Sequence, residues 1–337
     1  MIQVSPFGQC NGHVIDKITL SNEHITTSFI NFGARMTELN VADRDGNVKN
    51  IVLNYLDIAG YQKDTSYLGA VCGRFANRIR EGRISLDGET FQLDQNEGVH
   101  HLHGGKNGFH QRIWEYEISQ AHTSVCFTLN SPHLDMGYPG TCLIKVTFQL
   151  IGNEIRCILE GTTDQSTLLN LTLHNYFNLS GDFSSSICEH TLKIEAEQVT
   201  VTDDDNLPTG ELLAVQGTQY DFRAERLIDN KEVFSQRQKG YDSNYVLSGR
   251  REIEHLACQL SDAKSGRKLE IYTTEPGLQV YTGGYLSNDG VYNDYSGIAL
   301  EPQNFPDSPN INHFPNSVYT PEKSYFHAIK LVLSCDR

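Results

Sequence analysis

Short runs in which apolar and polar residues alternate dominate the chain, and residues typical of turns separate them. Residues 84–93 are the clearest example, because Asp87-Gly88 stands between the alternating runs Ile-Ser-Leu and Glu-Thr-Phe-Gln-Leu. Alternation with a period of two is typical of a strand with one buried face, and Asp-Gly favours the tight turn of a β-hairpin. This segment therefore predicts a hairpin centred on Asp87-Gly88.

Similar turn signals recur along the whole length of the chain. They predict further hairpins around Asp45-Gly46, Gly152-Asn153 and Ser265-Gly266. Helical periodicity is nearly absent, and the best helical candidates, residues 54–61 and 224–227, are too short to form a helical layer. We therefore expect an all-β protein built from antiparallel strands, with few short helices.

The length of the chain bears on the number of domains. For 337 residues, a prior of about 150 residues per domain suggests two domains, although large all-β domains often exceed that length. No Pro/Gly/Ser-rich linker, low-complexity tract or short repeat divides the sequence. We expect a single domain that spans residues 1–337 and has a large core.

The balance of charges is acidic, with a formal net charge of −15 and a sequence pI near 5.3. This balance argues against nucleic acid and against an anionic membrane surface as partners. No run approaches the roughly 18–20 apolar residues of a membrane span, and the first residues lack the basic start and apolar stretch of a signal peptide. The expected partner is a small or neutral molecule, and the expected location is the cytoplasm.

The cysteines are scattered without close CxxC pairs, and several fall in apolar, strand-like runs. Such spacing favours reduced, structural thiols over a disulfide framework. The eight cysteines lie at positions 10, 72, 126, 142, 157, 188, 258 and 335.

Two titratable residues lie in segments otherwise composed like buried strands. His174 falls within Leu-Thr-Leu-His-Asn-Tyr-Phe-Asn-Leu, and Glu301 falls within Ala-Leu-Glu-Pro-Gln-Asn-Phe, at the expected end of a strand. A partly desolvated carboxyl has a raised pKa and can act as a general base. A satisfied core histidine, and an ion pair between Glu301 and Arg74, are the structural alternatives. The aromatic and amide residues after His174, Tyr176 among them, also fit the face and hydroxyls of a sugar ring.

Further polar side chains lie next to apolar or aromatic residues. An apolar run leads into Gly-Arg-Phe-Ala-Asn-Arg-Ile, which carries Arg74, Asn77 and Arg78. Arginine offers a rigid fork of donors that suits hydroxyls and carboxylates, but a structural ion pair explains a buried arginine equally well. Asp242 in Gly-Tyr-Asp and Gln279 in Pro-Gly-Leu-Gln-Val-Tyr are open to the same two interpretations.

Four histidines fall within His100-His-Leu-His-Gly-Gly-Lys-Asn-Gly-Phe-His, and strand alternation predicts that His101 and His103 share one face. This segment offers no Asp, Glu or Cys at a recognisable ligand spacing, so we do not expect a metal site. The two glycines let a ligand approach the backbone closely. We interpret the segment as a site of hydrogen bonding or proton transfer, with an ordinary loop histidine as the alternative.

Six motifs, taken in order, resemble those of the aldose 1-epimerase (galactose mutarotase) family. They extend from about residue 68 to residue 310, and six matches in order are far more specific than any one of them. The resemblance implies a large antiparallel β-sandwich that binds a sugar in a cleft on one face. The matching segments are Gly73-Arg-Phe-Ala-Asn-Arg-Ile, His101-Leu-His-Gly-Gly, Leu173-His-Asn-Tyr-Phe-Asn-Leu, Gly240-Tyr-Asp, Pro276-Gly-Leu-Gln-Val-Tyr-Thr-Gly and Leu300-Glu-Pro-Gln-Asn-Phe-Pro-Asp.

The resemblance also implies roles for individual residues. His103, His174 and Glu301 match the family's catalytic positions, whereas His101 does not. The positions expected to bind sugar, from the match and from the polar and aromatic character of the motifs, are Arg74, Asn77, Tyr176, Asp242 and Gln279.

Three residues depart from the family's pattern. Leu173 and Gly284 stand where the family often has Asn, and Asn175 stands where it often has Ser. We expect these departures to affect the sugar preference more than the reaction.

The activity that the resemblance implies is interconversion of the α and β anomers of an aldohexose such as galactose or glucose. Glu301 is expected to act as the base at the O1 hydroxyl, and protonated His174 as the acid at the ring oxygen, with His103 assisting. Because two opposed proton-transfer groups suffice, no cofactor and no metal are expected. The protein is expected to be a monomer or a homodimer.

Three other functions stay open from the residues alone. A non-catalytic sugar-binding β-sandwich needs aromatics and amides but no matched acid and base. An enzyme that epimerises a phosphorylated hexose needs added Lys or Arg near the site, for which Arg74, Arg78, Arg80 and Arg83 are candidates. Glycoside hydrolysis needs two carboxylates that flank the bond, and Asp242 is the candidate for the second.

Overall fold

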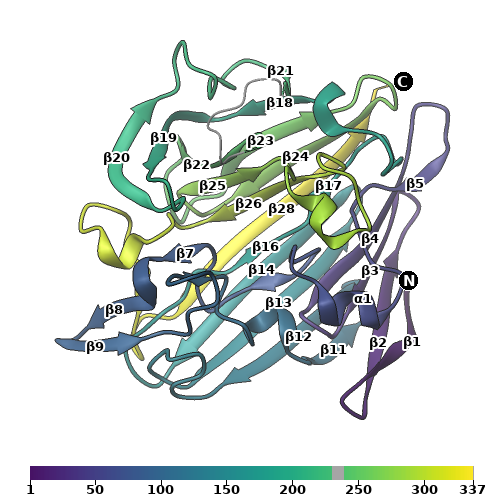
Figure 1. Ribbon diagram of the computed structural model, residues 1–337. Helices are drawn as coiled ribbons and strands as arrows, with labels where there is room; N and C mark the ends of the chain where they lie inside the picture. Colours follow the sequence, from purple (N-terminus) through teal and green to yellow (C-terminus); the bar gives the residue numbers. More distant parts are fainter. Residues whose placement is uncertain (230–238, 337) are drawn as a thin grey trace.

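Antiparallel strands dominate the computed structural model, which describes residues 1–229 and 239–336 (Figure 1). Within these residues the strands form three larger sheets and several two-stranded ones. The expected all-β fold is confirmed.

The N-terminal sheet has five strands, whose spatial order follows the sequence. All neighbours in it are antiparallel. Its strands are β1 (Ile2–Cys10), β2 (His13–Ser21), β3 (Ile25–Ile30), β4 (Arg35–Ala42) and β5 (Val48–Asn50).

The longest sheet has nine strands, several of which run diagonally across the view of Figure 1. Along β13, buried residues alternate with more exposed ones, as in a sheet with one covered face. In spatial order its strands are β11 (Glu115–Ser119), β12 (Ser124–Ser131), β13 (Cys142–Ile151), β14 (Glu154–Thr163), β28 (Tyr325–Cys335), β24 (Arg267–Thr273), β23 (His255–Ser261), β18 (Thr191–Ile194) and β21 (Arg226–Leu227).

The third sheet has six strands and carries several of the residues expected to bind sugar. In spatial order its strands are β17 (Tyr176–Phe177), β26 (Ile298–Gln303), β25 (Gly277–Tyr281), β22 (Asp242–Leu247), β19 (Ala196–Thr202) and β20 (Pro208–Ala214).

Short elements complete the fold. The two-stranded sheets are β6 (Val71–Cys72) with β16 (Thr172–Leu173), β7 (Arg78–Ile79) with β10 (His101–Leu102), β8 (Arg83–Leu86) with β9 (Glu89–Gln92), and β15 (Thr167–Leu168) with β27 (Val318–Tyr319). The helical segments are α1 (Ile58–Lys63) and the 3₁₀ turns η1 (Arg80–Gly82), η2 (Phe109–Gln111), η3 (Ile187–Glu189), η4 (Leu286–Asp289) and η5 (Ser308–Asn310). Across the described ranges, no helix has the length and apolar character needed to cross a membrane.

Apolar side chains from the larger sheets form one extensive core cluster, which includes residues from Ile2 to Leu333. Phe29 in β3 stacks on Phe148 in β13, with ring centroids 4.3 Å apart, so the five-stranded and nine-stranded sheets pack face to face. Burial of this apolar surface is the main force that holds the layers together. The eight cysteines are free.

All four predicted hairpins are confirmed. Strands β8 and β9 meet at Asp87-Gly88, where φ is 51° and 84°, the left-handed backbone that a two-residue type I′ turn requires. Strands β4 and β5, β13 and β14, and β23 and β24 pair across the other three predicted turns.

The helix predictions are less accurate. Helix α1 begins at Ile58, inside the predicted range 54–61, because the Asp57 side chain caps it by accepting a hydrogen bond from Gly60 N–H. The helix predicted over residues 224–227 is wrong, since Arg226–Leu227 form β21. This strand pairs with β18, a non-local contact that local sequence patterns do not reveal.

Candidate active site

A cleft with a volume of about 390 Å³ brings together segments that are far apart in the sequence. Its walls come from the loop before β6, from β7 and β10, from the junction of β16 and β17, and from β22, β25 and β26. Tyr285 at the rim is 37% exposed, whereas His103, His174 and Glu301 are 6%, 4% and 2% exposed. The three expected catalytic residues therefore meet at the floor of the cleft.

Glu301 lies inside β26 and not at its end, although Pro302 follows it. It pairs with Gln279 of β25, so the two side chains project from the same face of the sheet. Burial raises the pKa of Glu301 well above the usual range of a carboxyl, and the Asp242 carboxylate adds to this, while Arg78 opposes it. The carboxyl is thus biased toward its protonated form.

His174 lies where the chain changes its strand partner. Strand β16, just before it, pairs with β6, whereas β17, just after it, pairs with β26. Its backbone N–H donates to Ala70 O at 2.9 Å, and its carbonyl accepts from Gly69 N–H at 2.9 Å. Burial lowers the pKa of the His174 imidazole to about 3. The ring is therefore neutral at neutral pH.

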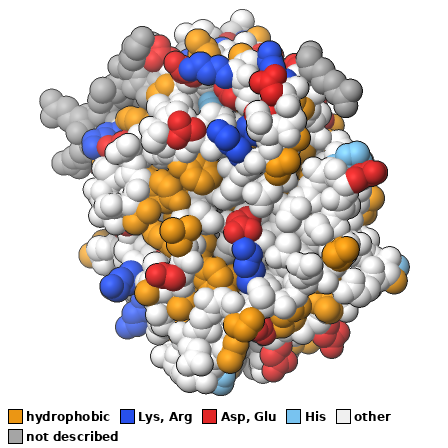
Figure 2. Space-filling view, turned by 90° about the vertical axis from the view of Figure 1, so that its right-hand side faces the viewer, with side chains coloured by type: hydrophobic (Ala, Val, Ile, Leu, Met, Phe, Trp, Pro, Cys, Tyr) orange, Lys and Arg blue, Asp and Glu red, His pale blue; other side chains and the backbone are white. Residues whose placement is uncertain are grey.

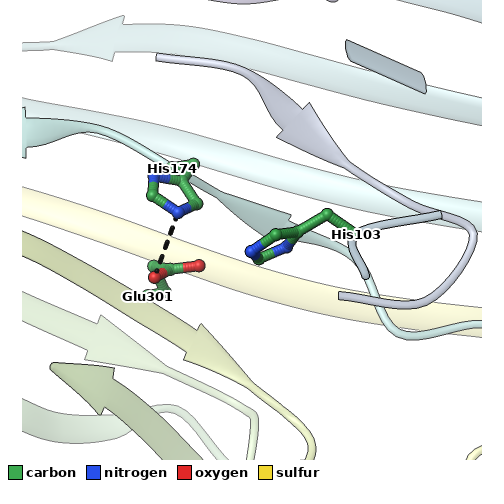
Figure 3. Close-up of side chains that lie close together, drawn as sticks. All are labelled: His103, His174 and Glu301. Atoms are coloured by element: carbon green, nitrogen blue, oxygen red, sulfur yellow. Dashed lines mark ion pairs between the residues drawn. The ribbon is translucent and has the colours of Figure 1, made fainter. Parts of the chain in front are cut away.

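His174 Nε2 lies 3.5 Å from Glu301 Oε1 (Figure 3). Because burial favours the uncharged form of each group, the pair is biased toward a protonated carboxyl on Glu301 beside a neutral His174. Transfer of the Glu301 proton to His174 would give a carboxylate and an imidazolium without exchange with solvent. The pair can therefore supply both an acid and a base.

His103 reaches the cleft from a loop, with its ring directed at the other two catalytic candidates (Figure 3). Its Nδ1 accepts the backbone N–H of Asn77 at 3.2 Å. Since burial also holds the pKa of His103 well below its usual value, the ring is neutral, and its proton must lie on Nε2. His103 thus offers a hydrogen-bond donor to a ligand.

His101 does not share the face of His103. The backbone of His103 is left-handed, with φ of 48°, and this ends the alternation expected for the strand. The His101 ring instead lies between the Asp94 carbonyl and the Tyr138 hydroxyl, each 2.6 Å away. His101 is therefore a satisfied core residue.

Ligand atoms of His103, His174 and Glu301 lie within 4.8 Å of one another, a spacing from which a metal site could be built. A histidine binds a metal through an unprotonated ring nitrogen. In His103 that nitrogen is Nδ1, which the Asn77 N–H already occupies. The donor set therefore suits a hydrogen-bonded ligand better than a metal.

The sugar contact expected of Arg74 does not fit the position of its side chain. The buried guanidinium donates to the carbonyls of Ser131, Pro132 and Pro139 and to the hydroxyls of Ser131 and Thr167. Arg74 is not among the described residues that line the cleft. Its hydrogen bonds hold the loop after β12 in place.

Arg78 lines the cleft instead. Its Nε and Nη2 donate to the two carboxylate oxygens of Glu97 at 2.7 and 2.8 Å, and its Nη1 lies 4.0 Å from Asp242 Oδ2. Asn77, just before it, has a left-handed backbone with φ of 67°, which changes the direction of the side chains that follow. The sequence motif contains both Arg74 and Arg78, but its spacing does not indicate which of the two lines the cleft.

The other expected sugar-binding residues do line the cleft. Gln279 Nε2 donates to Asp242 Oδ1 at 2.6 Å, which fixes the two side chains relative to each other. Asn77 forms part of the lining. The ring of Tyr176 lies beside that of His174, with ring centroids 5.1 Å apart. The structure thus gathers polar groups around an aromatic surface.

Tyr67 was not singled out from the sequence. Its ring lies 4.6 Å from that of His103 and 5.7 Å from that of His174, measured between centroids. It packs beside both histidines and lines the cleft. Only long-range packing brings this loop residue there, so no local signal identified it.

The three departures from the family's pattern do not line the cleft. Leu173 belongs to the main apolar core, and Asn175 donates through Nδ2 to Met36 O at 3.5 Å. A Cβ at Gly284 would lie 2.1 Å from Lys239 O, so the close approach of this backbone requires glycine. We expected these residues to affect the sugar preference. None of them lines the cleft, so they have no direct contact through which to do so.

The charges of the cleft also limit its ligands. Among the described residues, the lining contains four carboxyl groups and one guanidinium, that of Arg78. Figure 2 shows one face of the molecule, on which Lys and Arg side chains are interspersed with Asp and Glu. The cleft therefore favours a neutral polar ligand over an anionic one.

A buried acid–base pair at the floor of a polar cleft, held by a β-sandwich, defines a class of enzymes that move protons on a small ligand. Comparisons with known proteins agree with this class. Residues 16–332 match the family model described as aldose 1-epimerase. The chain is 37% identical to galactose mutarotase from Homo sapiens over 94% of its own length and 93% of the relative. It is 36% identical to aldose 1-epimerase from Haemophilus influenzae over 94% of each protein.

Solved structures show the same relationship. An aldose epimerase homologue from C. elegans superposes with a TM-score of 0.88 at 30% identity, covering 95% of this chain and 98% of that one. Galactose 1-epimerase from Lactobacillus acidophilus has the same fold, with a TM-score of 0.86 over 100% of this chain and 99% of that one, at 24% identity. The chain belongs to the aldose 1-epimerase family and is an isomerase.

Proposed function

We propose that this protein interconverts the α and β anomers of an aldohexose, such as galactose or glucose, by opening and closing the sugar ring. The observation that carries the proposal is the buried pair of His174 and Glu301, whose facing atoms lie 3.5 Å apart at the floor of the cleft. Relatives named galactose mutarotase and aldose 1-epimerase support this choice of reaction and substrate.

The polar groups around the pair would hold the sugar hydroxyls. Gln279 Oε1 and Glu301 Oε2 are buried without a hydrogen-bond partner in the described part of the chain. Buried polar atoms are normally satisfied, and hydroxyls of a sugar can satisfy both. Arg78 takes the role that we expected of Arg74, and Tyr176 offers its ring to the apolar face of the sugar.

Ring opening breaks the C1–O5 bond and turns the O1 hydroxyl into a carbonyl. Glu301, as the carboxylate, takes the proton from O1, while His174, as the imidazolium, gives its proton to O5. His103 donates a hydrogen bond from Nε2 near O5 and assists this step. Rotation about the C1–C2 bond presents the other carbonyl face, and ring closure reverses both proton transfers.

Burial biases Glu301 toward its protonated form and His174 toward its neutral form. One proton transfer within this pair gives the catalytic carboxylate and imidazolium. Each closure regenerates the carboxylate and the imidazolium with which ring opening began, and no cofactor is needed. A positioned acid or base contributes about 10²- to 10⁴-fold, so the two together account for a large acceleration.

A phosphorylated hexose is a poorer match to this site. Arg78 is the one Lys or Arg that the described lining offers, and Glu97 already occupies its guanidinium through two hydrogen bonds. A phosphate would also approach the carboxylates of Asp242 and Asp289 in the same cleft. We therefore favour an uncharged sugar.

Two measurements on the wild-type protein test the proposal. Polarimetry of fresh α-D-galactose and α-D-glucose, in dilute and weakly catalysing buffer, should show faster decay of optical rotation with protein than without it. Calorimetry should show weaker binding of glucose 6-phosphate than of glucose. No acceleration by folded protein that binds galactose would overturn the proposal in favour of a sugar-binding protein.

A further inference from the structure

The segments that carry the catalytic pair run antiparallel to each other, but their backbone ladder is short. Strand β17 pairs with β26 only through Tyr176 with Ala299 and Phe177 with Ile298. Before this point the chain leaves β26, and β16 pairs with β6 instead. His174 therefore lies beyond the end of the ladder that joins its segment to that of Glu301.

Beyond the ladder, side chains make the connections between the two segments. Thr172 Oγ1 donates to Pro302 O at 2.8 Å, and the Thr172 side chain is fully buried. Asn170 Oδ1 accepts from Asn304 N–H at 2.8 Å. Because Thr172 is two residues before His174 and Pro302 directly follows Glu301, the first of these bonds is the nearest one to the catalytic pair.

A side chain makes the connection at Pro302, because the ladder between β17 and β26 does not extend this far. Pro302 has no N–H, so it cannot donate to a neighbouring strand, but its carbonyl accepts a hydrogen bond from the Thr172 hydroxyl. The bond satisfies this carbonyl and at the same time fixes the distance between β16 and β26.

We propose that Thr172 is a positioning residue that sets the separation of His174 and Glu301 through its hydrogen bond to Pro302. The hydrogen bond between Asn304 N–H and Asn170 Oδ1 supports this arrangement. The inference rests on the proposed function, because it concerns the proton transfers of that reaction. Thr172 is not among the residues that line the cleft and acts only through the segments that carry the pair.

The physical basis is the dependence of proton transfer on distance. Acid–base catalysis requires each group to lie within about 2.6–3.2 Å of the substrate atom that it serves. The 3.5 Å separation of His174 Nε2 and Glu301 Oε1 determines how the two groups can reach O5 and O1 together. Small displacements of catalytic groups have large effects, and about 1 Å can cost about 10²-fold in rate. Loss of the Thr172 bond frees β16 from β26 and widens this gap.

Two substitutions that remove the same methyl group isolate the hydroxyl. Thr172→Ala lacks the hydrogen bond and should lower kcat roughly tenfold or more, while KM changes by less than about twofold, because the sugar contacts stay in place. Thr172→Ser keeps the hydroxyl and should restore kcat to within about threefold of wild type. A merely structural role would lower the melting temperature without this split between kcat and KM.

Thr27 offers a matched control, because it is also fully buried and its Oγ1 donates to Glu38 O at 2.9 Å, away from the cleft. Thr27→Ala should leave kcat unchanged. Equal kcat in Thr172→Ala and Thr172→Ser, with active wild type, would overturn the inference alone. A wild-type protein that does not accelerate mutarotation would overturn the proposed function itself.

Discussion

His174 Nε2 faces Glu301 Oε1 across 3.5 Å, and both side chains are almost completely buried. Burial disfavours the charged form of each, so the pair is biased toward sharing one proton. An acid and a base that share a proton act as a unit. This relationship determines how substitutions of the two residues should combine.

Glu301→Gln and His174→Asn should each lower kcat by about 10²- to 10⁴-fold, because each removes one of the two proton transfers. The double variant should be hardly slower than the slower single variant, since groups that act as a unit are strongly non-additive. Steady-state polarimetry of the three variants and wild type gives this comparison. Losses that multiply in the double variant would show that the residues act independently.

Arg74 and Arg78 should respond differently to the same substitution. Arg78→Gln removes a donor from the cleft and should raise KM by about tenfold or more, while the loss of its two hydrogen bonds to Glu97 should cost about 1–2 kcal/mol of stability. Arg74→Gln leaves buried carbonyls unpaired and should lower the free energy of unfolding by about 3–5 kcal/mol, with KM close to wild type. Denaturant unfolding and kinetics on both variants check this; a large rise in KM for Arg74→Gln alone would restore the role first expected of it.

Features that depend on local sequence could be predicted, whereas features that depend on long-range packing could not. The hairpin at Asp87-Gly88 depends on local turn chemistry, so the sequence predicted it correctly. The orientation of Arg78 depends on the left-handed backbone of Asn77, and the position of His174 depends on a change of strand partner. Both are consequences of long-range packing. The apolar segment around His174 and the family resemblance indicated this residue, but neither revealed the change of strand partner that positions it.

The strand that contains Glu301 shows the same limit. Pro302 suggested that the strand ends at Glu301, because proline interrupts a ladder. In the structure β26 continues to Gln303, since β17 is too short to pair with Pro302 and the missing N–H costs no bond there. Pro302 could be read from the sequence, but the length of the neighbouring strand β17 could not.

Glu275 predicts a pH dependence of stability outside the cleft. Burial raises its pKa to about 7 in the folded protein, from 4.5, despite Arg251 3.6 Å away. The folded state therefore binds more protons than the unfolded state between these values, and the stabilisation is lost as pH rises from 4.5 through 7. Glu275→Gln should remove about 3 kcal/mol of this dependence.

Urea unfolding of wild type and Glu275→Gln at pH 5 and pH 8 measures this effect. The difference in unfolding free energy between the two pH values should be smaller in the variant. Identical pH dependence in both proteins would mean that the buried Glu275 carboxyl does not titrate in this range.

The tautomer of His103 predicts that the reaction does not depend on a metal. Its Nδ1 accepts the Asn77 N–H, so its Nε2 carries a proton and serves as a donor. Exhaustive dialysis against a chelator should therefore leave the rate of mutarotation unchanged, with less than a stoichiometric amount of metal in the purified protein. Loss of activity that added zinc or another divalent cation restores would contradict this assignment.

The central claim is that Glu301 performs the proton transfer at O1. Its most direct test is the decay of optical rotation of fresh α-D-galactose with wild type, Glu301→Gln and Glu275→Gln, the last being a matched change of a buried carboxyl outside the cleft. The account predicts fast decay with wild type and Glu275→Gln, and a rate at least about 10²-fold lower with folded Glu301→Gln. Decay as fast with Glu301→Gln as with wild type would contradict it.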